Sequence, residues 1–368
     1  MFFKFVSTTI FTLMNLYSLN FFQNTFLNSK NKIYLNAIFV FCFTLITLFN
    51  ILYFIAFRAE NLNGVLFKAS AISTGASFLL FLSSALFSII GFTTKFVKFS
   101  NKRREFLKLS FNISFLIFIF SFLFKGFYNG IKKPFINRVD IKISNLKDDL
   151  SLAVLSDIHL GKYLGKSFLE LLVDEVNKLN ADALLIVGDM FDIKAKDLKD
   201  TLNPLNNLKI PCFFVLGNHE YYSGAYELIE VLKKYKVKVL ENENLEFKGV
   251  NFAGVYDRAG QRFGYLKPNL KKALQNKNEN LPTILLAHQP KYIYENVKDE
   301  VDLCICGHTH AGQIFPFSLL VLMEQKYLYG LYKEQDKQIY VSSGAGFWGP
   351  PVRILAPAEI AFLNLKKG

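Results

Sequence analysis

The apolar pattern of residues 1–130 is that of membrane helices. Residues 33–57 and 69–94 contain no charged residue, and each exceeds the roughly 20 residues that span a bilayer as a helix. Residues 109–124 are shorter, but the lysines that flank them can extend their side chains to the interfaces. We therefore predict a transmembrane region of about four helices, the fourth being the N-terminal segment.

That N-terminal segment, residues 5–27, is also uncharged but carries many Asn, Ser, Thr and Gln residues. A cleaved signal peptide is the alternative to a span. The segment lacks a clear small-residue cleavage site, so the sequence favours a span.

The pattern changes after residue 150, where short apolar runs alternate with helical spacing. Helical spacing of apolar positions covers residues 167–179 and about 225–234. The apolar runs that end in Asp, Asn or His are 152–159, 181–190, 212–220, 282–290 and 301–310. Such alternation predicts an α/β domain with buried strands. We assign residues 131–149 to a linker and 150–368 to this domain.

Composition supports the same division. Residues 1–150 hold 29 of the 40 Phe residues, while all five His residues follow residue 150. The first 150 residues also hold 17 of the 43 basic and 5 of the 30 acidic side chains, which is +12 of the net charge of +13. Basic residues beside membrane spans suit anionic lipid head groups. Membrane lipids are therefore predicted as partners, and nucleic acid is not.

The basic residues bear on which side of the membrane the second part occupies. The loop from Lys95 to Lys108 carries six basic residues against Glu105, a cytoplasmic signal. One span after this loop would place the C-terminal part outside the cytoplasm. Basic residues that follow the last span, Lys125, Lys132, Lys133 and Arg138, oppose that assignment. The sequence slightly favours the extracytoplasmic side of a bacterial inner membrane.

Carboxylate, amide and imidazole groups gather at the ends of the predicted strands. They are Asp157, His159, Asp189, Asp192, Asn218, His219, His288, His308 and His310. Because ligands bind beyond the carboxyl ends of parallel strands, we expect these groups to meet in one site. The D-x-H and H-x-H pairs place alternate side chains on one side of an extended chain.

Such nitrogen and oxygen donors suit Zn, Fe, Mn and similar divalent ions. So many ligands exceed what one ion with an open position can use. Two ions that share a bridging carboxylate would clamp a phosphoester. Cys304 and Cys306 are predicted to be small buried strand residues rather than ligands.

The order of these motifs resembles the calcineurin-like metallophosphoesterase superfamily over about residues 150–365. The matching motifs are Asp157-Ile158-His159, Gly188-Asp189-Met190-Phe191-Asp192, Gly217-Asn218-His219-Glu220, His288 and Gly307-His308-Thr309-His310. With membrane spans ahead of them, they resemble the bacterial membrane-anchored branch. The resemblance implies a four-layer α/β/β/α sandwich and a hydrolase that uses two divalent metal ions, with Mn, Fe and Zn as the candidates.

The resemblance also implies a role for each site residue. One metal would be held by Asp157, His159 and His310, and the other by Asn218, His288 and His308. Asp189 would bridge the two ions. His219 would be the catalytic histidine that protonates or stabilises the leaving oxygen. Asp192 would orient the imidazole of His219 and raise its pKa.

Three function classes follow. The first is hydrolysis of a lipid or lipid-linked phosphoester, and the resembled branch is linked to cleavage of UDP-2,3-diacylglucosamine in lipid A synthesis. The second is hydrolysis of a soluble phosphoester by a tethered enzyme, and the third is a non-enzymatic scaffold. The apolar run at residues 311–332, directly after His310, favours the first class if it reaches the membrane interface with Tyr327 and Tyr329 at head-group level. A buried strand of the sandwich is the alternative for this run.

Overall fold

The computed structural model describes residues 2–27, 32–56, 63–93, 100–298, 300–334 and 337–368. They form two compact units. One comprises residues 1–128 with 349–352, and the other comprises residues 129–348 with 353–368.

The first unit contains four long helices. Their bounds are α1 Phe2–Phe26, α2 Ile33–Ala56, α3 Gly64–Thr93 and α4 Asn101–Ile131. Three of them, α2, α3 and α4, are long and apolar enough to cross a membrane. In the part of the chain that the structure describes, α1 does not join that group. The three apolar helices indicate that the protein associates with a membrane.

Polar residues of these helices bond to one another. Asn15 of α1 donates to the Thr47 hydroxyl of α2 at 3.0 Å, and Asn50 of α2 donates to Ser77 of α3 at 2.6 Å. Hydrogen bonds of this kind join helices in an apolar medium, where an unpaired amide is costly. They explain how α1 can be rich in amides and hydroxyls and still pack against α2.

The basic loop predicted from Lys95 to Lys108 is only partly a loop. Helix α4 begins at Asn101, so Lys102, Arg103 and Arg104 lie in its first turns. Lys95 and Lys98 lie outside the described residues. The predicted span of residues 109–124 is the middle of α4.

The second unit is built on two six-stranded sheets. The first sheet has, in spatial order, β1 Phe135–Ile143, β12 Glu359–Lys367, β2 Leu150–Leu155, β3 Ala183–Val187, β4 Cys212–Val215 and β5 Val237–Val239. The second has β10 Gly330–Glu334, β11 Lys337–Val341, β9 Leu303–Cys306, β8 Thr283–Leu286, β7 Val250–Gly254 and β6 Glu243–Phe247. All five predicted strand regions are present, but each strand stops before its polar residues.

Helices cover the outer face of each sheet. The helices that the structure describes in this unit are α5 Lys166–Leu179, α6 Asn218–Ser223, α7 Ala225–Lys233, α8 Ala259–Phe263, α9 Leu270–Ala273, α10 Pro290–Asn296 and α11 Phe317–Gln325, with 3-10 turns at Ala195–Asp197, Asn203–Asn207 and His310–Gly312. Apolar residues of α5 and α7 pack on the first sheet, and those of α9 and α10 pack on the second.

A third apolar core, with Leu185 and Phe213 on one side and Phe252 and Ile284 on the other, lies between the sheets. The predicted α/β/β/α sandwich is therefore confirmed. Cys304 and Cys306 are buried in β9, as expected for small strand residues.

The predicted linker at residues 131–149 requires correction, because most of it is strand β1. Residues 135–143 pair in parallel with Glu359–Lys367 of β12. Ile141 and Ile143 are buried between the sheets, while Asp140 and Lys142 are exposed. The charged residues hid this period-2 pattern. Only three residues separate the end of α4 at Ile131 from β1 at Phe135.

Strand direction determines where the polar residues lie. Strands β2, β3 and β4 run parallel in the first sheet, and β7, β8 and β9 run parallel in the second. The loops after β2, β3, β4, β8 and β9 carry the predicted site residues. The carboxyl ends of parallel strands are the usual ligand-binding edge of an α/β sheet.

Candidate metal centre

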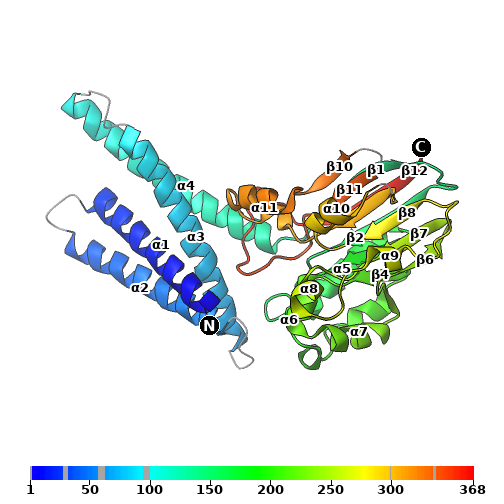
Figure 1. The fold of residues 1–368 in the computed structure, drawn as a ribbon. Coiled ribbons are helices and arrows are strands. Elements are labelled where there is room, and N and C mark those ends of the chain that lie inside the picture. Colours follow the sequence, from blue (N-terminus) through cyan, green and yellow to red (C-terminus); the bar gives the residue numbers. More distant parts are fainter. Residues whose placement is uncertain (1, 28–31, 57–62, 94–99, 299, 335–336) are drawn as a thin grey trace. The chain divides into compact units, whose positions relative to one another are not determined.

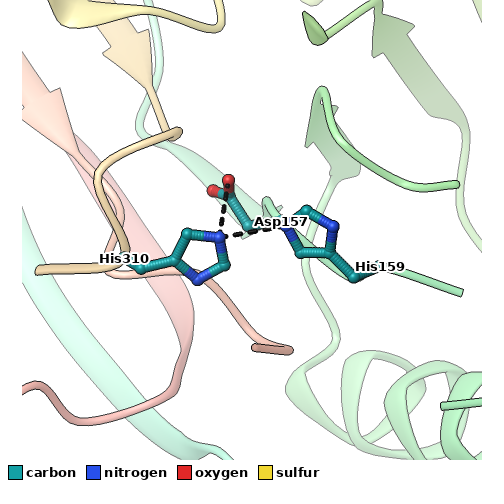
Figure 2. A group of neighbouring side chains, drawn as sticks. All are labelled: Asp157, His159 and His310. Carbon is teal, nitrogen blue, oxygen red and sulfur yellow. Dashed lines mark hydrogen bonds and ion pairs between the residues drawn. The ribbon is translucent and has the colours of Figure 1, made fainter. Parts of the chain in front are cut away.

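The first group of site residues joins the loop after β2 to the loop after β9. Ligand atoms of Asp157, His159 and His310 lie within 4.8 Å of one another. The two Nε2 atoms of His159 and His310 are 3.0 Å apart, and Nε2 of His310 is 3.4 Å from Oδ1 of Asp157. Figure 2 shows the three side chains converging on one point. His159 and His310 are 151 positions apart in sequence, and together with Asp157 they offer one carboxylate and two imidazoles to a common metal ion.

The second group lies between the loops after β3, β8 and β9. It comprises Asp189, His288 and His308, whose ligand atoms also fall within 4.8 Å of one another. His288 donates from Nδ1 to the Val187 carbonyl at 2.8 Å. That bond orients the ring so that Nε2 faces the site, 3.2 Å from Oδ2 of Asp189.

Asn218 is the first residue of helix α6, and two residues separate it from the end of β4. Its Oδ1 is buried without a hydrogen-bond partner. It is the remaining residue of the predicted second metal site.

Asp192 connects two histidines. Its Oδ1 accepts from Nδ1 of His159 at 2.8 Å and from Nδ1 of His219 at 2.6 Å. Nε2 of His219 is 3.9 Å from Oδ2 of Asp189. The predicted partnership of Asp192 with His219 is thus present as a contact. Its contact with His159 was not foreseen and fixes that ring as well.

The backbone is strained where these residues sit. Positive φ angles occur at Asp157 (52°), His159 (51°), Asp189 (52°), His308 (71°) and His310 (49°). Non-glycine residues rarely adopt this left-handed region, and each instance costs on the order of 1–3 kcal/mol. Five such residues in one site indicate that the surrounding fold holds the loops in an unfavourable backbone conformation, and this conformation brings the side chains of the site together.

Two glycines allow the loops to approach closely. A Cβ on Gly307 would lie 1.7 Å from Oγ of Ser156 and 2.6 Å from Oδ2 of Asp157. A Cβ on Gly217 would lie 2.2 Å from Oδ1 of Asp189. Any side chain at either position would displace a carboxylate of the site.

Glu220 ties the loop after β3 to the loop after β4. Its carboxylate accepts from the backbone N–H groups of Asp189 (3.0 Å), Met190 (2.8 Å), Phe191 (3.0 Å) and Gly217 (2.6 Å). From the sequence, this residue was named only as part of the Gly217-Asn218-His219-Glu220 motif and was assigned no role. Its place after the histidine of G-N-H-E is the signal that could have identified it, because a helix begins there and exposes backbone donors.

Arg353 likewise ties loops together, joining the loop after β11 to His310. This residue was not identified from the sequence. Its buried guanidinium donates to the carbonyls of Ser343, Gly344, Gly346, Ala356 and His310, and Nη2 lies 3.2 Å from Nδ1 of His310. Its guanidinium is surrounded by carbonyl oxygens, and its five N–H donors allow it to bind several of them at once. A lone arginine in "PPVRILAP" carries no pattern that predicts this.

The histidines differ in their tendency to hold a proton. Burial opposes protonation of His219, but Asp189 and Asp192 outweigh it and raise its pKa to about 9. Burial, with the charges of neighbouring histidines, lowers the pKa of His308 to about 3. Burial, His159 and Arg353 lower the pKa of His310 well below its usual value. A neutral imidazole is the form that binds a metal, and a protonated one can act as an acid.

The two carboxylates differ as well. Burial raises the pKa of Asp157, and the charge of Asp189 adds to that effect. Burial also opposes ionisation of Asp189, but His288, His219 and His159 outweigh it and hold its pKa well below the usual range. Of these two carboxylates, Asp189 is the one kept in its charged form.

The donor set fits divalent metal ions. Imidazole nitrogens and carboxylate oxygens face one another in the two groups described above and in a third, which comprises His159, Asp192 and His219, and Oδ1 of Asn218 is buried without a partner. Facing lone pairs repel unless a cation lies between them. Asp189 belongs to the second group, and its role as a bridge between two ions stays a prediction.

Comparisons with known proteins agree with this geometry. Residues 150–312 match the family model described as calcineurin-like phosphoesterase. A metallophosphoesterase of Helicobacter pylori is 43% identical over 305 residues, which cover 82% of each chain. One of Campylobacter jejuni is 36% identical over 369 residues, which cover 99% of this chain and 98% of that one.

A Danio rerio protein described as a transmembrane protein with metallophosphoesterase domain is 34% identical over 261 residues, which cover 66% of this chain and 60% of that one. The match to the Helicobacter protein extends over most of both chains. The chain belongs to the calcineurin-like metallophosphoesterase family and is a metal-dependent phosphoester hydrolase.

Proposed function

We propose that the protein is a two-metal hydrolase of a lipid or lipid-linked phosphoester at a bacterial inner membrane. One ion would be held by Asp157, His159 and His310, and the other by Asn218, His288 and His308, with Asp189 shared. The donors suit Mn, Fe or Zn. When bound, such ions would lower the pKa of a water molecule, so that a nucleophile is available at neutral pH, and would neutralise charge on the oxygens of the transferred phosphoryl group.

His219 would hold a proton for the leaving oxygen. Its Nδ1 donates to Asp192 at 2.6 Å, so the ring is held with Nε2 as the atom open to the substrate. Asp189 and Asp192 raise its pKa to about 9, against the effect of burial. The imidazolium is therefore the favoured form at neutral pH and can protonate an alkoxide as it departs. A protonated histidine at this position argues against a non-enzymatic scaffold, because a scaffold has no need of a general acid.

The lipid substrate is supported by the connection of the two units. Helix α4 is one of the three described helices that are long and apolar enough to cross a membrane, and three residues separate its end from strand β1 of the first sheet. A chain of three residues reaches only about 10–14 Å. The hydrolase unit is therefore tethered within a short distance of any membrane that α4 enters, and lipid phosphoesters would be concentrated near it.

A direct test uses the purified full chain in lipid nanodiscs supplied with Mn, Fe or Zn ions. We expect turnover of a lipid phosphoester, with UDP-2,3-diacylglucosamine among those offered, to exceed that of a soluble phosphodiester such as bis(p-nitrophenyl) phosphate in kcat/KM. Equal or greater kcat/KM on soluble nucleotides would favour the tethered soluble-substrate enzyme. No turnover of any phosphoester with any of the three ions would contradict the proposal.

The side of the membrane is a separate prediction. The basic residues at the start of α4 favour the cytoplasm, and α4 is one span. Reporter fusions at residue 100 and at the C-terminus should therefore report opposite sides, with residue 100 cytoplasmic. UDP-2,3-diacylglucosamine is made and used on the cytoplasmic face. A cytoplasmic C-terminus would overturn the prediction and favour that substrate.

A further inference from the structure

Helix α11, Phe317–Gln325, exposes a continuous apolar surface beside the metal centre. Over residues 317–323 it carries no charge and reads Phe-Ser-Leu-Leu-Val-Leu-Met. The exposed fractions are 83% for Met323, 59% for Leu320 and 54% for Leu319, and the side chains of Phe315, Phe317 and Leu322 are also exposed. The predicted alternative of a buried strand is therefore wrong, and the segment is an exposed helix of the second unit (Figure 1).

The helix is fixed to the loop that carries His308 and His310. A Cβ on Gly312 would lie 2.2 Å from Cα of Ser318, so the helix packs directly on that glycine. The Thr309 hydroxyl donates to the carbonyl of Leu328, just after the helix. Its last residue, Gln325, accepts from the backbone N–H of Lys291 at 3.2 Å. The apolar surface therefore has a set position relative to the site.

The character of α11 points to a bilayer rather than to a protein groove. Every residue of the helix from Phe317 to Met323 is apolar except Ser318, which packs on Gly312, whereas a helix that docks on a protein usually has one apolar stripe. Its following residues suit a membrane interface: Lys326 lies 4.7 Å over the ring of Tyr294, and both Tyr294 and Tyr329 are exposed. Tyrosines and a lysine that border an apolar segment are typical of the head-group level.

One expected member of that border is absent. Tyr327 is buried, with its ring 5.0 Å from that of Tyr332, so it cannot reach head groups. The charge of Glu324 is paired with Lys291 at 2.6 Å. No unpaired acid of α11 therefore opposes an anionic surface.

We propose that α11 inserts into the surface of the membrane to which the chain is tethered. The three-residue connection from α4 to β1 keeps the second unit close to the bilayer that α4 would enter. The helix would lie in the interface plane with its apolar side chains about 5–10 Å deep. Acyl chains could then remain in the membrane while the phosphoester group reaches the loop of His308 and His310. Insertion does not depend on which substrate is cleaved. Only the kinetic consequence rests on the proposed lipid substrate.

The test measures depth in the full chain. A nitroxide is attached to Met323→Cys in a Cys42→Ser background, since the other cysteines are buried, and the protein is placed in liposomes of phosphatidylethanolamine and phosphatidylglycerol. We expect the label to be more accessible to oxygen, which partitions into lipid, than to a water-soluble nickel chelate. The matched control is Glu230→Cys on α7, an exposed helical position of the same unit, which should show the reverse.

Each other outcome overturns the proposal. A label at residue 323 that favours the nickel chelate would place α11 in water. Low accessibility to both reagents would mean that α11 packs against other parts of this chain or against a second copy.

A kinetic experiment then tests the link to the substrate. Leu320→Asp with Leu322→Asp should lower turnover of a lipid phosphoester severalfold more than turnover of a small nitrophenyl phosphodiester. The control Tyr226→Asp, at an exposed position on α7, should change neither. If the label is inserted but the variant loses equal activity on both substrates, the helix does insert and the proposed access of lipid substrates through it is wrong. Retention of both activities with an inserted label would favour the soluble-substrate enzyme.

Discussion

Replacing Asp189 with Asn is expected to remove bound metal and nearly all phosphoesterase activity together. Its Oδ2 lies 3.2 Å from Nε2 of His288, and its pKa is held well below the usual range because histidine charges outweigh burial. The amide has the same shape but carries no charge and presents only one oxygen. The loss in metal affinity should exceed the roughly 10- to 100-fold that follows loss of a ligand's supporting partner.

Metal content per chain and kcat/KM should be measured on the same preparation. The control is Asp200→Asn, the same chemical change at an exposed carboxylate paired with Lys166, which should leave both unchanged. Wild-type metal content and rate in the Asp189 variant would mean that the two-metal interpretation is wrong. Loss of one ion with the other retained would confine Asp189 to the second site.

Replacing His219 with Ala is expected to lower kcat by about 10²- to 10⁴-fold, the contribution of a positioned general acid, while metal content stays at the wild-type level. The ring contacts Asp192 at 2.6 Å and stands 3.9 Å from Asp189. It lies in a third group of possible ligands, with His159 and Asp192, which we do not assign to a metal. Only its proton would be lost from the reaction.

The leaving group provides an independent readout. Esters of acidic phenols depart without a proton, so the variant should lose less activity on a nitrophenyl ester than on an alkyl ester. Asp192→Asn should reproduce part of this pattern, because it loosens the imidazole without removing it. Loss of metal in the His219 variant would reassign this residue as a ligand, and an equal loss on both esters would rule out its role as an acid.

The sequence identifies the groups of this site well because the fold brings strand ends together. All five histidines and the carboxylates follow apolar runs that became β2, β3, β4, β8 and β9. Parallel strands in two facing sheets leave their carboxyl ends at one edge. The order of the motifs therefore predicted which residues would meet, although they are far apart along the chain.

Residues that hold the loops were harder to predict. Glu220 stands in the G-N-H-E motif, but the motif does not show that its carboxylate binds backbone N–H groups. Arg353 binds backbone carbonyls, which have no sequence signature, and it was not identified. Strand β1 was assigned to a linker because Asp140 and Lys142 on its exposed face interrupt the apolar pattern. The state of residues 317–325 depends on what surrounds them, since an apolar run of this length fits a buried strand or an exposed helix equally well.

The left-handed backbone at Asp157, His159, Asp189, His308 and His310 has a consequence for the life of the protein in a cell. The strain in these loops lowers the stability of the folded chain, and binding of metal ions to the side chains would offset that cost. An ion that binds the folded chain alone stabilises it by mass action. Chains made when metal is scarce would then spend more time with the loops after β2, β3 and β9 open to proteases. The amount of enzyme at the membrane, and not only its rate, would follow the supply of metal.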